Sequence, residues 1–234
     1  MLADWLGQGY SATGHNVEAK AGPLRKLDMR LLRLALFAGL AILAAHLLDP
    51  LAFRYIRVDD VYGADWGRML RVMGFLPLWL AAGVALILED GDRGRQLLRC
   101  RGALLIAGAT LGGVAAELLK LVFRRLRPGE LGEYDFRPFT DRPLSTGGLG
   151  LPSSHALVAF GAAAVLARLF PRARWLWWGL ASGCAFTRVA AGRHFLSDVV
   201  VAAVVGWLVG AMVWRWLGSE TSPTGERRPV PSSP

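Results

Sequence analysis

Six uncharged apolar runs recur along the chain, and charged or polar segments separate them. The runs cover residues 34–48, 72–88, 102–116, 156–167, 175–187 and 199–214. A helix that crosses a bilayer needs about 20 residues, so most of the runs must include flanking polar residues to span it. Basic loops and tryptophans near several run ends are typical of membrane helix bundles. The pattern predicts an all-α membrane protein, a bundle of six transmembrane helices.

Composition supports a membrane protein. Of 234 residues, 53% are hydrophobic and only 19% are charged, fewer than the roughly 25% of ordinary soluble domains. A net charge of +9 would suit nucleic acid, anionic lipid or a phosphorylated substrate. In an apolar chain it favours a lipid bilayer and a lipid phosphate as partners, with no nucleic acid. The two cysteines are too few for a disulfide-rich scaffold. A soluble all-α protein, in which the apolar runs are buried helices, remains the alternative to a membrane protein.

The chain has the length of a single domain with two tails. Residues 1–29 are polar and lack the apolar core of a signal peptide. We expect them to form a cytoplasmic N-terminal tail, 30–217 to form the six-helix membrane domain, and 218–234 to be a disordered cytoplasmic tail. With both termini inside, inner segments hold fifteen Lys and Arg residues and outer segments twelve. This charge bias predicts that the outer segments face away from the cytoplasm. The short chain and its Arg-, Ala- and Leu-rich usage indicate a bacterium, so we expect the inner membrane as the location, with the outer segments on the periplasmic side.

Ionisable residues at span ends gather on the predicted outer side, where they are candidates for function. Lys120 and Arg127 are seven residues apart, so on a continuous helix ended by Pro128 both would point the same way. The next helix opens at 152–155 with Pro-Ser-Ser-His, and exposed N–H groups at a helix start can bind an anion. The sequence thus predicts an anion site between these two helix ends.

The last two spans contribute Arg188, His194 and Asp198. His194 and Asp198 are four residues apart, so on one helical face the carboxylate can hold one imidazole nitrogen. Lys120, Arg127 and Arg188 would neutralise a phosphate. His194 could attack phosphorus while His155 protonates the departing oxygen. No carboxylate cluster or Cys/His set offers a metal cage, so neither a metal nor another cofactor is expected.

Each of these residues also has an ordinary structural explanation. A single Lys or Arg near a helix end usually extends to the membrane interface, and we expect no more of Arg124, Arg125 and Arg193. Glu117 is a charge partner of Lys120 or a packing residue. His46 has no evident partner and is assigned a structural role. Three glycines, Gly147, Gly148 and Gly150, are expected to make a flexible loop. The joint pattern, rather than any one residue, indicates a phosphate site.

Three ordered motifs resemble the signature of the type 2 phosphatidic acid phosphatase (PAP2) superfamily. They are Lys120-x6-Arg127-Pro128, Pro152-Ser153-Ser154-His155 and Thr187-Arg188-x5-His194-x3-Asp198. Members include lipid phosphate, undecaprenyl-diphosphate, phosphatidylglycerophosphate and lipid A phosphatases. The resemblance implies a metal-independent reaction through a phosphohistidine.

The resemblance also implies a role for each motif residue. His194 would be the nucleophile, Asp198 its orienting partner and His155 the proton donor and later base. The phosphate oxygens would be held by Lys120, Arg127, Ser153, Ser154 and Arg188. Two positions depart from the family pattern: Ser154 replaces a glycine, which adds strain if that glycine has a positive φ, and Thr187 replaces a serine.

Three functions fit these residues. The first is removal of a terminal phosphate from a lipid phosphate or diphosphate. The second is transfer of that phosphate to an acceptor lipid, and the third is lipid binding or transport without catalysis. Membrane-spanning composition disfavours a vanadate haloperoxidase. Undecaprenyl diphosphate, phosphatidate, phosphatidylglycerophosphate and lipid A all fit as substrates. The loop 129–151 is expected to cover the headgroup.

Overall fold

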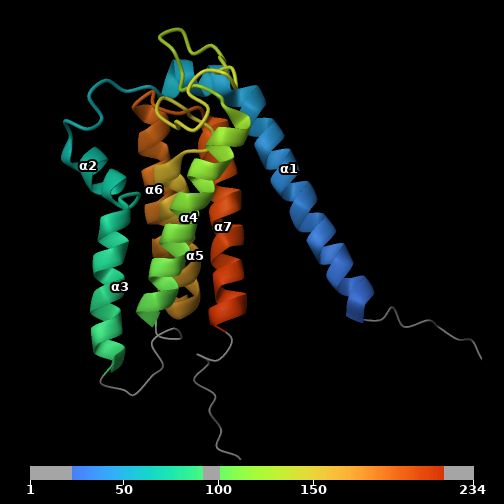
Figure 1. Cartoon of the computed structure of the whole chain (residues 1–234), viewed down its shortest axis with the longest axis vertical. Helices are drawn as coiled ribbons and strands as arrows, with labels where there is room; N and C mark the ends of the chain where they lie inside the picture. Colours follow the sequence, from blue (N-terminus) through green and yellow to red (C-terminus); the bar gives the residue numbers. More distant parts are fainter. Residues whose placement is uncertain (1–22, 92–100, 219–234) are drawn as a thin grey trace, which may run out of the picture. The chain divides into compact units, whose positions relative to one another are not determined.

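The computed structural model describes residues 23–91 and 101–218. Throughout these residues the fold is helical, and the described chain contains no β-strand beyond two isolated bridges. The helices, shown in Figure 1, are α1 (Pro23–Ile56), α2 (Asp65–Val72), α3 (Leu76–Gly91), α4 (Arg101–Phe123), α5 (Ser154–Leu169), the short 3₁₀ helix η2 (Pro171–Ala173), α6 (Arg174–Ala190) and α7 (Leu196–Leu217). The predicted all-α fold is confirmed.

The chain divides into two compact units, Met1–Phe37 and Ala38–Pro234. Within the first unit, the described residues form the N-terminal part of α1. The second unit contains the rest of α1 and all the other helices. The predicted tail at 1–29 lies outside the described residues up to position 22, and helix α1 begins at Pro23. The predicted tail at 218–234 lies outside them from residue 219 onward.

Five of the six apolar runs lie within single helices, whereas the run 72–88 is interrupted at residues 73–75, between α2 and α3. Three helical segments are long and apolar enough to cross a membrane, namely Met29–Ile56, Arg101–Phe123 and Leu196–Leu217. A fourth candidate is the pair Asp65–Val72 and Leu76–Asp90, which bends by 59°. Helices α5 and α6 have 16 and 17 residues, short for a span of about 20. Membrane-spanning helices are therefore present, and their number stays a prediction.

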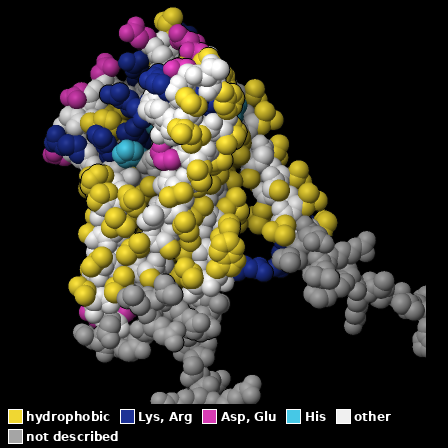
Figure 2. Space-filling model, viewed as in Figure 1, with side chains coloured by type: hydrophobic (Ala, Val, Ile, Leu, Met, Phe, Trp, Pro, Cys, Tyr) yellow, Lys and Arg dark blue, Asp and Glu magenta, His cyan; other side chains and the backbone are white. Residues whose placement is uncertain are grey.

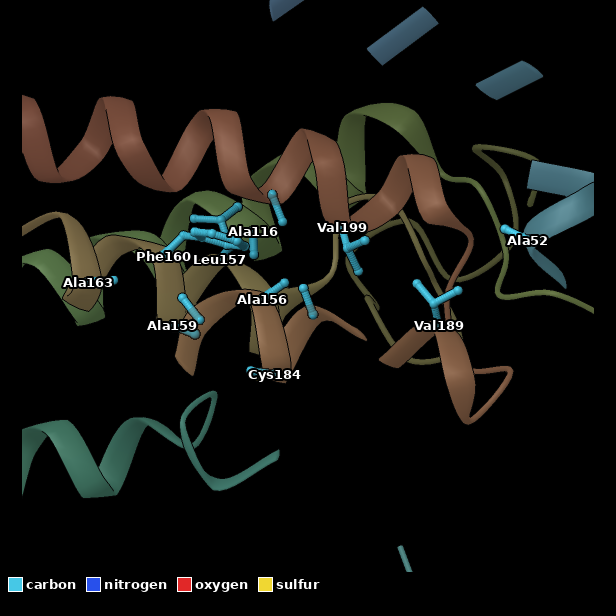
Figure 3. Close-up of a cluster of buried hydrophobic side chains, with 13 residues drawn as sticks. Ala52, Ala116, Ala156, Leu157, Ala159, Phe160, Ala163, Cys184, Val189 and Val199 are labelled. Carbon is cyan, nitrogen blue, oxygen red and sulfur yellow. The ribbon is translucent and has the colours of Figure 1, made fainter. Parts of the chain in front are cut away.

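Helix α5 is the central helix of the second unit and packs against α4, α6 and α7. Its sequence is rich in alanine, and Figure 3 shows its side chains meeting those of the neighbouring helices in one buried cluster. Small residues permit this packing: a Cβ atom added at Gly206 of α7 would lie 3.0 Å from the Gly161 nitrogen of α5. Close backbone contact of this kind is common in membrane bundles, where apolar surface alone does not hold helices together.

Hydrophobic and charged side chains separate along the bundle. Figure 2 shows hydrophobic side chains over most of the visible face and most of its Lys, Arg and His side chains at one end. On α4, Leu118 and Val122 are exposed, although both are large and apolar. An exposed apolar belt below a charged end is the surface that a bilayer requires.

Helix α4 ends earlier than its sequence predicts. The expected continuous helix through Arg127 is wrong, because Arg124 adopts a positive φ of 53° after the last helical residue, Phe123. The chain beyond it is extended, with isolated antiparallel bridges from Arg125 to Phe136 and from Leu126 to Leu149. Lys120 and Arg127 therefore do not share a helical face.

Arg124 builds the loop that follows α4. Its buried guanidinium donates hydrogen bonds to the carbonyl oxygens of Arg137, Pro138, Asp141 and Pro143. These four bonds offset a left-handed backbone that a non-glycine residue rarely adopts. The expectation that Arg124 extends to the membrane interface is wrong, and the loop is organised around this arginine.

Candidate active site

Four helix ends meet where the sequence predicted the site. These are the end of α4, the start of α5, the end of α6 and the start of α7 (Figure 1). Backbone hydrogen bonds join them: the Ser153 N–H donates to the Asp198 carbonyl at 3.2 Å, and the Gly150 N–H donates to the Arg125 carbonyl at 2.7 Å. Segments far apart in the sequence therefore share one local framework.

The histidine and aspartate of the third motif form a buried pair. His194 Nδ1 lies 3.3 Å from Asp198 Oδ2, and both side chains are nearly inaccessible to solvent. The predicted pairing is confirmed, but its geometric reason differs, because His194 precedes α7 rather than sharing a helical face with Asp198. The Phe195 N–H also donates to Oδ2, at 2.9 Å. A proton on Nδ1 then faces the carboxylate and leaves Nε2 with a free lone pair.

Electrostatics keep this imidazole neutral. Burial lowers the pKa of His194 below its ordinary value, and the hydrogen bond and charge of Asp198 oppose that shift. The positive charges of Arg188 and Arg127 act in the same direction as burial. At neutral pH His194 is therefore an uncharged base, as a nitrogen nucleophile must be.

Arg188 lies at the buried end of α6 and is bound by a tyrosine. Its Nη1 donates to the Tyr62 hydroxyl at 2.6 Å, and that hydroxyl donates to the Thr187 carbonyl at 3.2 Å. The guanidinium of Arg71, on α2, lies 4.6 Å from the centre of the same ring. Sequence analysis missed both Tyr62 and Arg71. The only sign of Arg71 was a charge directly before an apolar run.

The lysine of the first motif is fixed by Glu117 and Ser154. Lys120 Nζ lies 2.9 Å from Glu117 Oε1 and donates to the Ser154 hydroxyl, which in turn donates to Glu117 at 2.6 Å. Glu117 is thus a charge partner of Lys120, one of the two alternatives considered. Ser154 has no positive φ, so replacing the family glycine adds no strain of that kind.

The remaining motif residues lie close by. Half-buried His155 is within electrostatic reach of Arg188, His194 and Lys120. The exposed Arg127 is close enough for its charge to interact with both Arg188 and His194. A further motif residue, Ser153, is fully buried, and no hydrogen-bond partner of its hydroxyl is found among the described residues. The structure brings together all eight predicted site residues, which are Lys120, Arg127, Ser153, Ser154, His155, Arg188, His194 and Asp198.

Arg125 is part of this framework and was not expected to be. Its guanidinium is buried and donates to Asp198 Oδ1 at 2.5 Å and to the Ser197 hydroxyl at 2.8 Å. It also lies 3.3 Å from His46 Nε2. The expectations of an arginine at the interface and of a histidine without a partner are both wrong. The contacts of Arg125 with Asp198 and with His46 join residues more than seventy positions apart in the sequence, so no local pattern could identify these two contacts.

Gly150 also differs from its expected role. It is buried, and a Cβ atom there would lie 3.2 Å from Asp198 Oδ2 and 3.0 Å from the Leu126 carbonyl oxygen. The prediction of a merely flexible loop is wrong at this position, because the backbone passes directly against the aspartate. A side chain at Gly150 would displace the carboxylate of Asp198, which holds His194.

The assembled groups suit one kind of ligand. Lys and Arg side chains and the N-terminus of α5 surround two imidazoles, and the pairing of His194 Nδ1 with Asp198 leaves its Nε2 free. A tetrahedral anion is stabilised by such cations and backbone donors. Within 23–91 and 101–218, no three His, Cys, Asp or Glu side chains gather in a way that would hold a metal ion. The geometry supports chemistry on a phosphate group.

Comparison with known proteins gives matches over the same region. Residues 101–222 match the family model described as the PAP2 superfamily. Lipid A 1-phosphatase of Rhizobium etli is 30% identical over 155 residues, 60% of this chain and 67% of that protein. Lipid A 4'-phosphatase of Porphyromonas gingivalis is 25% identical over 135 residues, 53% of this chain and 57% of that protein. The chain thus spans little more than half of the second relative.

A solved structure has the same fold. The PAP2 type phosphatidylglycerolphosphate phosphatase from Bacillus subtilis aligns with a TM-score of 0.53 at 19% sequence identity. The alignment covers 78% of this chain and 92% of that one. At this identity the likeness concerns the arrangement of helices.

Proposed function

Since this chain belongs to the PAP2 superfamily, we propose that it hydrolyses a lipid phosphate or lipid diphosphate through a phosphohistidine, without a metal ion. The coarser part of this statement, a membrane lipid phosphatase, rests on the family and on the phosphatases to which the chain is similar. The finer part rests above all on one observation. His194 is a buried neutral imidazole with Nδ1 held by Asp198 and Nε2 free.

In the first step Nε2 of His194 attacks phosphorus. A nitrogen–phosphorus bond forms as the bond between phosphorus and the lipid oxygen breaks. His155, whose pKa burial and the neighbouring cations lower to about 4, takes up a proton when the phosphate anion binds beside it. It gives that proton to the lipid oxygen, which leaves as the lipid hydroxyl. Asp198 stabilises the positive charge that develops on the attacking imidazole, as a carboxylate does in hydrolase triads.

In the second step a water molecule attacks the phosphohistidine. The water oxygen bonds to phosphorus, the nitrogen–phosphorus bond breaks, and its electron pair returns to Nε2. His155 takes a proton from the water and is again ready to donate it. Inorganic phosphate leaves, so both the enzyme and the proton balance are restored.

Charge stabilisation in both steps comes from the protein. Lys120, Arg127 and Arg188 would bind the phosphate oxygens, together with donors from Ser153 and Ser154 at the start of α5. Fixed cations and N–H groups stabilise a phosphoryl transition state without reorganising. This is the physical basis for proposing metal independence.

Lipid A is the substrate to test first. The chain is similar to a lipid A 1-phosphatase and to a lipid A 4'-phosphatase, and both are named for a phosphate of lipid A. We place the protein in the bacterial inner membrane, with both termini in the cytoplasm and the site on the outer face. The bacterial relatives and the charge bias of the loops support this location.

The test measures inorganic phosphate released by the purified protein in detergent with EDTA present. The panel contains lipid A, undecaprenyl diphosphate, phosphatidate and phosphatidylglycerophosphate. We expect release from at least one lipid. His194→Gln should abolish it, and His155→Gln should reduce it about 100- to 10,000-fold.

Arg101→Gln is the matched control. It breaks the ion pair with Asp90, of 2.7 Å, which joins α3 and α4 away from the site, and it should retain activity. Release that requires an added metal ion, or that survives in His194→Gln, would overturn the mechanism. Loss of free phosphate together with a phosphorylated acceptor lipid would instead identify a phosphotransferase.

A further inference from the structure

A second line of charged residues lies behind the proposed nucleophile. Asp198 uses Oδ2 for His194 and for the Phe195 N–H, and its Oδ1 receives Arg125 Nη2 at 2.5 Å. Arg125 is 2% exposed as a side chain, and Asp198 is 0% exposed. Water therefore does not compete for this contact, and the orientation of the carboxylate depends on the protein alone.

Arg125 is itself held from several sides. The same Nη2 donates to the Ser197 hydroxyl at 2.8 Å, and Nη1 lies 3.3 Å from His46 Nε2. The rings of Tyr134 and Phe195 lie 5.0 Å from its central carbon. Planar, multiply bonded and stacked arginines cannot be replaced by lysine without loss of contacts.

Asp49 of α1 closes the network. It accepts the Ser197 N–H at 2.8 Å and the Tyr134 hydroxyl at 2.5 Å, and it also accepts the Ser197 hydroxyl. Burial and the neighbouring Asp49 raise the pKa of Tyr134 to about 12, so the tyrosine stays a hydrogen-bond donor. Asp49 is therefore linked to Arg125 through Ser197 and Tyr134, each of which contacts the guanidinium.

We propose that Arg125 is a positioning residue for phosphoryl transfer, which fixes the carboxylate of Asp198 so that it holds His194 in attacking orientation. Asp49 and Ser197 keep Arg125 and the first turn of α7 in register with that carboxylate. The inference rests on the proposed phosphatase function. Arg125 does not touch the substrate: its action passes through Asp198.

Arg125 also limits how strongly Asp198 attracts a proton to His194. The titratable and charged groups around His194 are Asp198 on α7, Arg188 on α6, Arg127 in the segment after α4 and His155 on α5. Arg125 contacts Asp198 through the other carboxylate oxygen, and His46 of α1 contacts Arg125. Removing only the Arg125 charge leaves Asp198 uncompensated, which favours a protonated His194 and an inactive nucleophile.

Two substitutions separate geometry from charge. Arg125→Lys keeps the charge but cannot make all three contacts, whereas Arg125→Gln loses the charge as well. With the lipid that the wild type hydrolyses, we expect kcat to fall about 100-fold in both variants and KM to stay within about 3-fold. The acidic limb of the kcat/KM profile should move to higher pH, by about one unit, only in Arg125→Gln.

Arg101→Gln, which breaks an ion pair away from the site, is the control for general loss of stability and should change neither kcat nor the profile. Melting temperatures identify any variant that fails to fold, and Arg125→Lys then carries the test alone through its ratio of kcat to KM. Wild-type kcat in both Arg125 variants would overturn the inference while leaving the phosphatase intact. An equal fall in kcat in Arg101→Gln would also overturn it. No phosphate release by the wild type would instead count against the proposed function.

Discussion

Ser154 stands between a lysine and a glutamate, and its hydroxyl is both an acceptor and a donor. Lys120 donates to it, and it donates to Glu117 at 2.6 Å. A glycine at this position could make neither bond. The hydroxyl therefore helps to fix an ammonium group that is 6% exposed as a side chain, in the position where it would meet a phosphate.

We predict that Ser154→Gly weakens substrate binding. Lys120 would keep its ion pair with Glu117 but lose one hydrogen bond to a charged group, so KM should rise about 10-fold with kcat little changed. Steady-state kinetics of phosphate release measure both constants. Ser154→Ala is the matched variant, because it keeps a Cβ atom without the hydroxyl and should behave alike. A faster Ser154→Gly enzyme would mean that the serine obstructs the site.

His194 makes stability depend on pH. Its pKa is lowered in the folded protein by burial, whereas in the unfolded chain it titrates near about 6.5. As pH falls through that value, His194 binds a proton in the unfolded state but not in the folded state, so the free energy of unfolding decreases. Between about pH 7 and 5 the melting temperature should fall more in the wild type than in His194→Gln. Parallel falls in the two proteins would contradict the assigned cause.

At the residue scale, spacing predicted the site because each motif lies within a short segment. Helix ends that meet on one side of the bundle are enough to bring the motif residues together, among them Lys120, Ser153 and His155. Arg125 could not be identified in this way. Its aspartate lies 73 residues further along the chain, and a cation at the end of an apolar run fits a lipid headgroup equally well.

At the element scale, apolar periodicity located the helices but not their ends. Helix α4 stops at Phe123 because the buried Arg124 binds loop carbonyls, a tertiary effect that no local pattern contains. A close tertiary contact also accompanies the break between α2 and α3. A Cβ atom at Gly74 would lie 2.6 Å from both the Cβ and the carbonyl oxygen of His155, so the bend brings this glycine against the first turn of α5.

The packing of α5 depends on its one interior glycine. A Cβ atom at Gly161 would collide with the Gly108 carbonyl oxygen and lie 3.3 Å from its carbonyl carbon. Gly161→Ala should therefore separate α5 from α4 and lower the free energy of unfolding by about 1–3 kcal/mol. Gly179→Ala on α6 is the control, since nothing lies within 4 Å of the added atom. Melting temperatures in detergent should fall for Gly161→Ala alone, and equal falls would count against this packing.

At the scale of the whole molecule, burial divides the cations of the proposed outer segments into two groups. The outer segments predicted from the sequence hold twelve Lys and Arg residues. Five of these twelve are buried, namely Lys120, Arg124, Arg125, Arg137 and Arg188. Buried cations bound to protein groups are not free to interact with headgroups. Seven accessible cations therefore remain in these segments, fewer than the fifteen Lys and Arg residues of the segments that we propose to lie in the cytoplasm.

The orientation can be tested through activity. We predict that sealed right-side-out vesicles hydrolyse a water-soluble short-chain lipid phosphate, because the site opens on the outer face by the positive-inside rule. Sealed inverted vesicles should remain inactive until detergent admits the substrate, and total activity after permeabilisation should then match. Vesicles that carry His194→Gln give the background. Activity confined to sealed inverted vesicles would reverse the assignment and place the site in the cytoplasm. In that case both the raw count of Lys and Arg residues and the count corrected for burial would have failed to predict the topology.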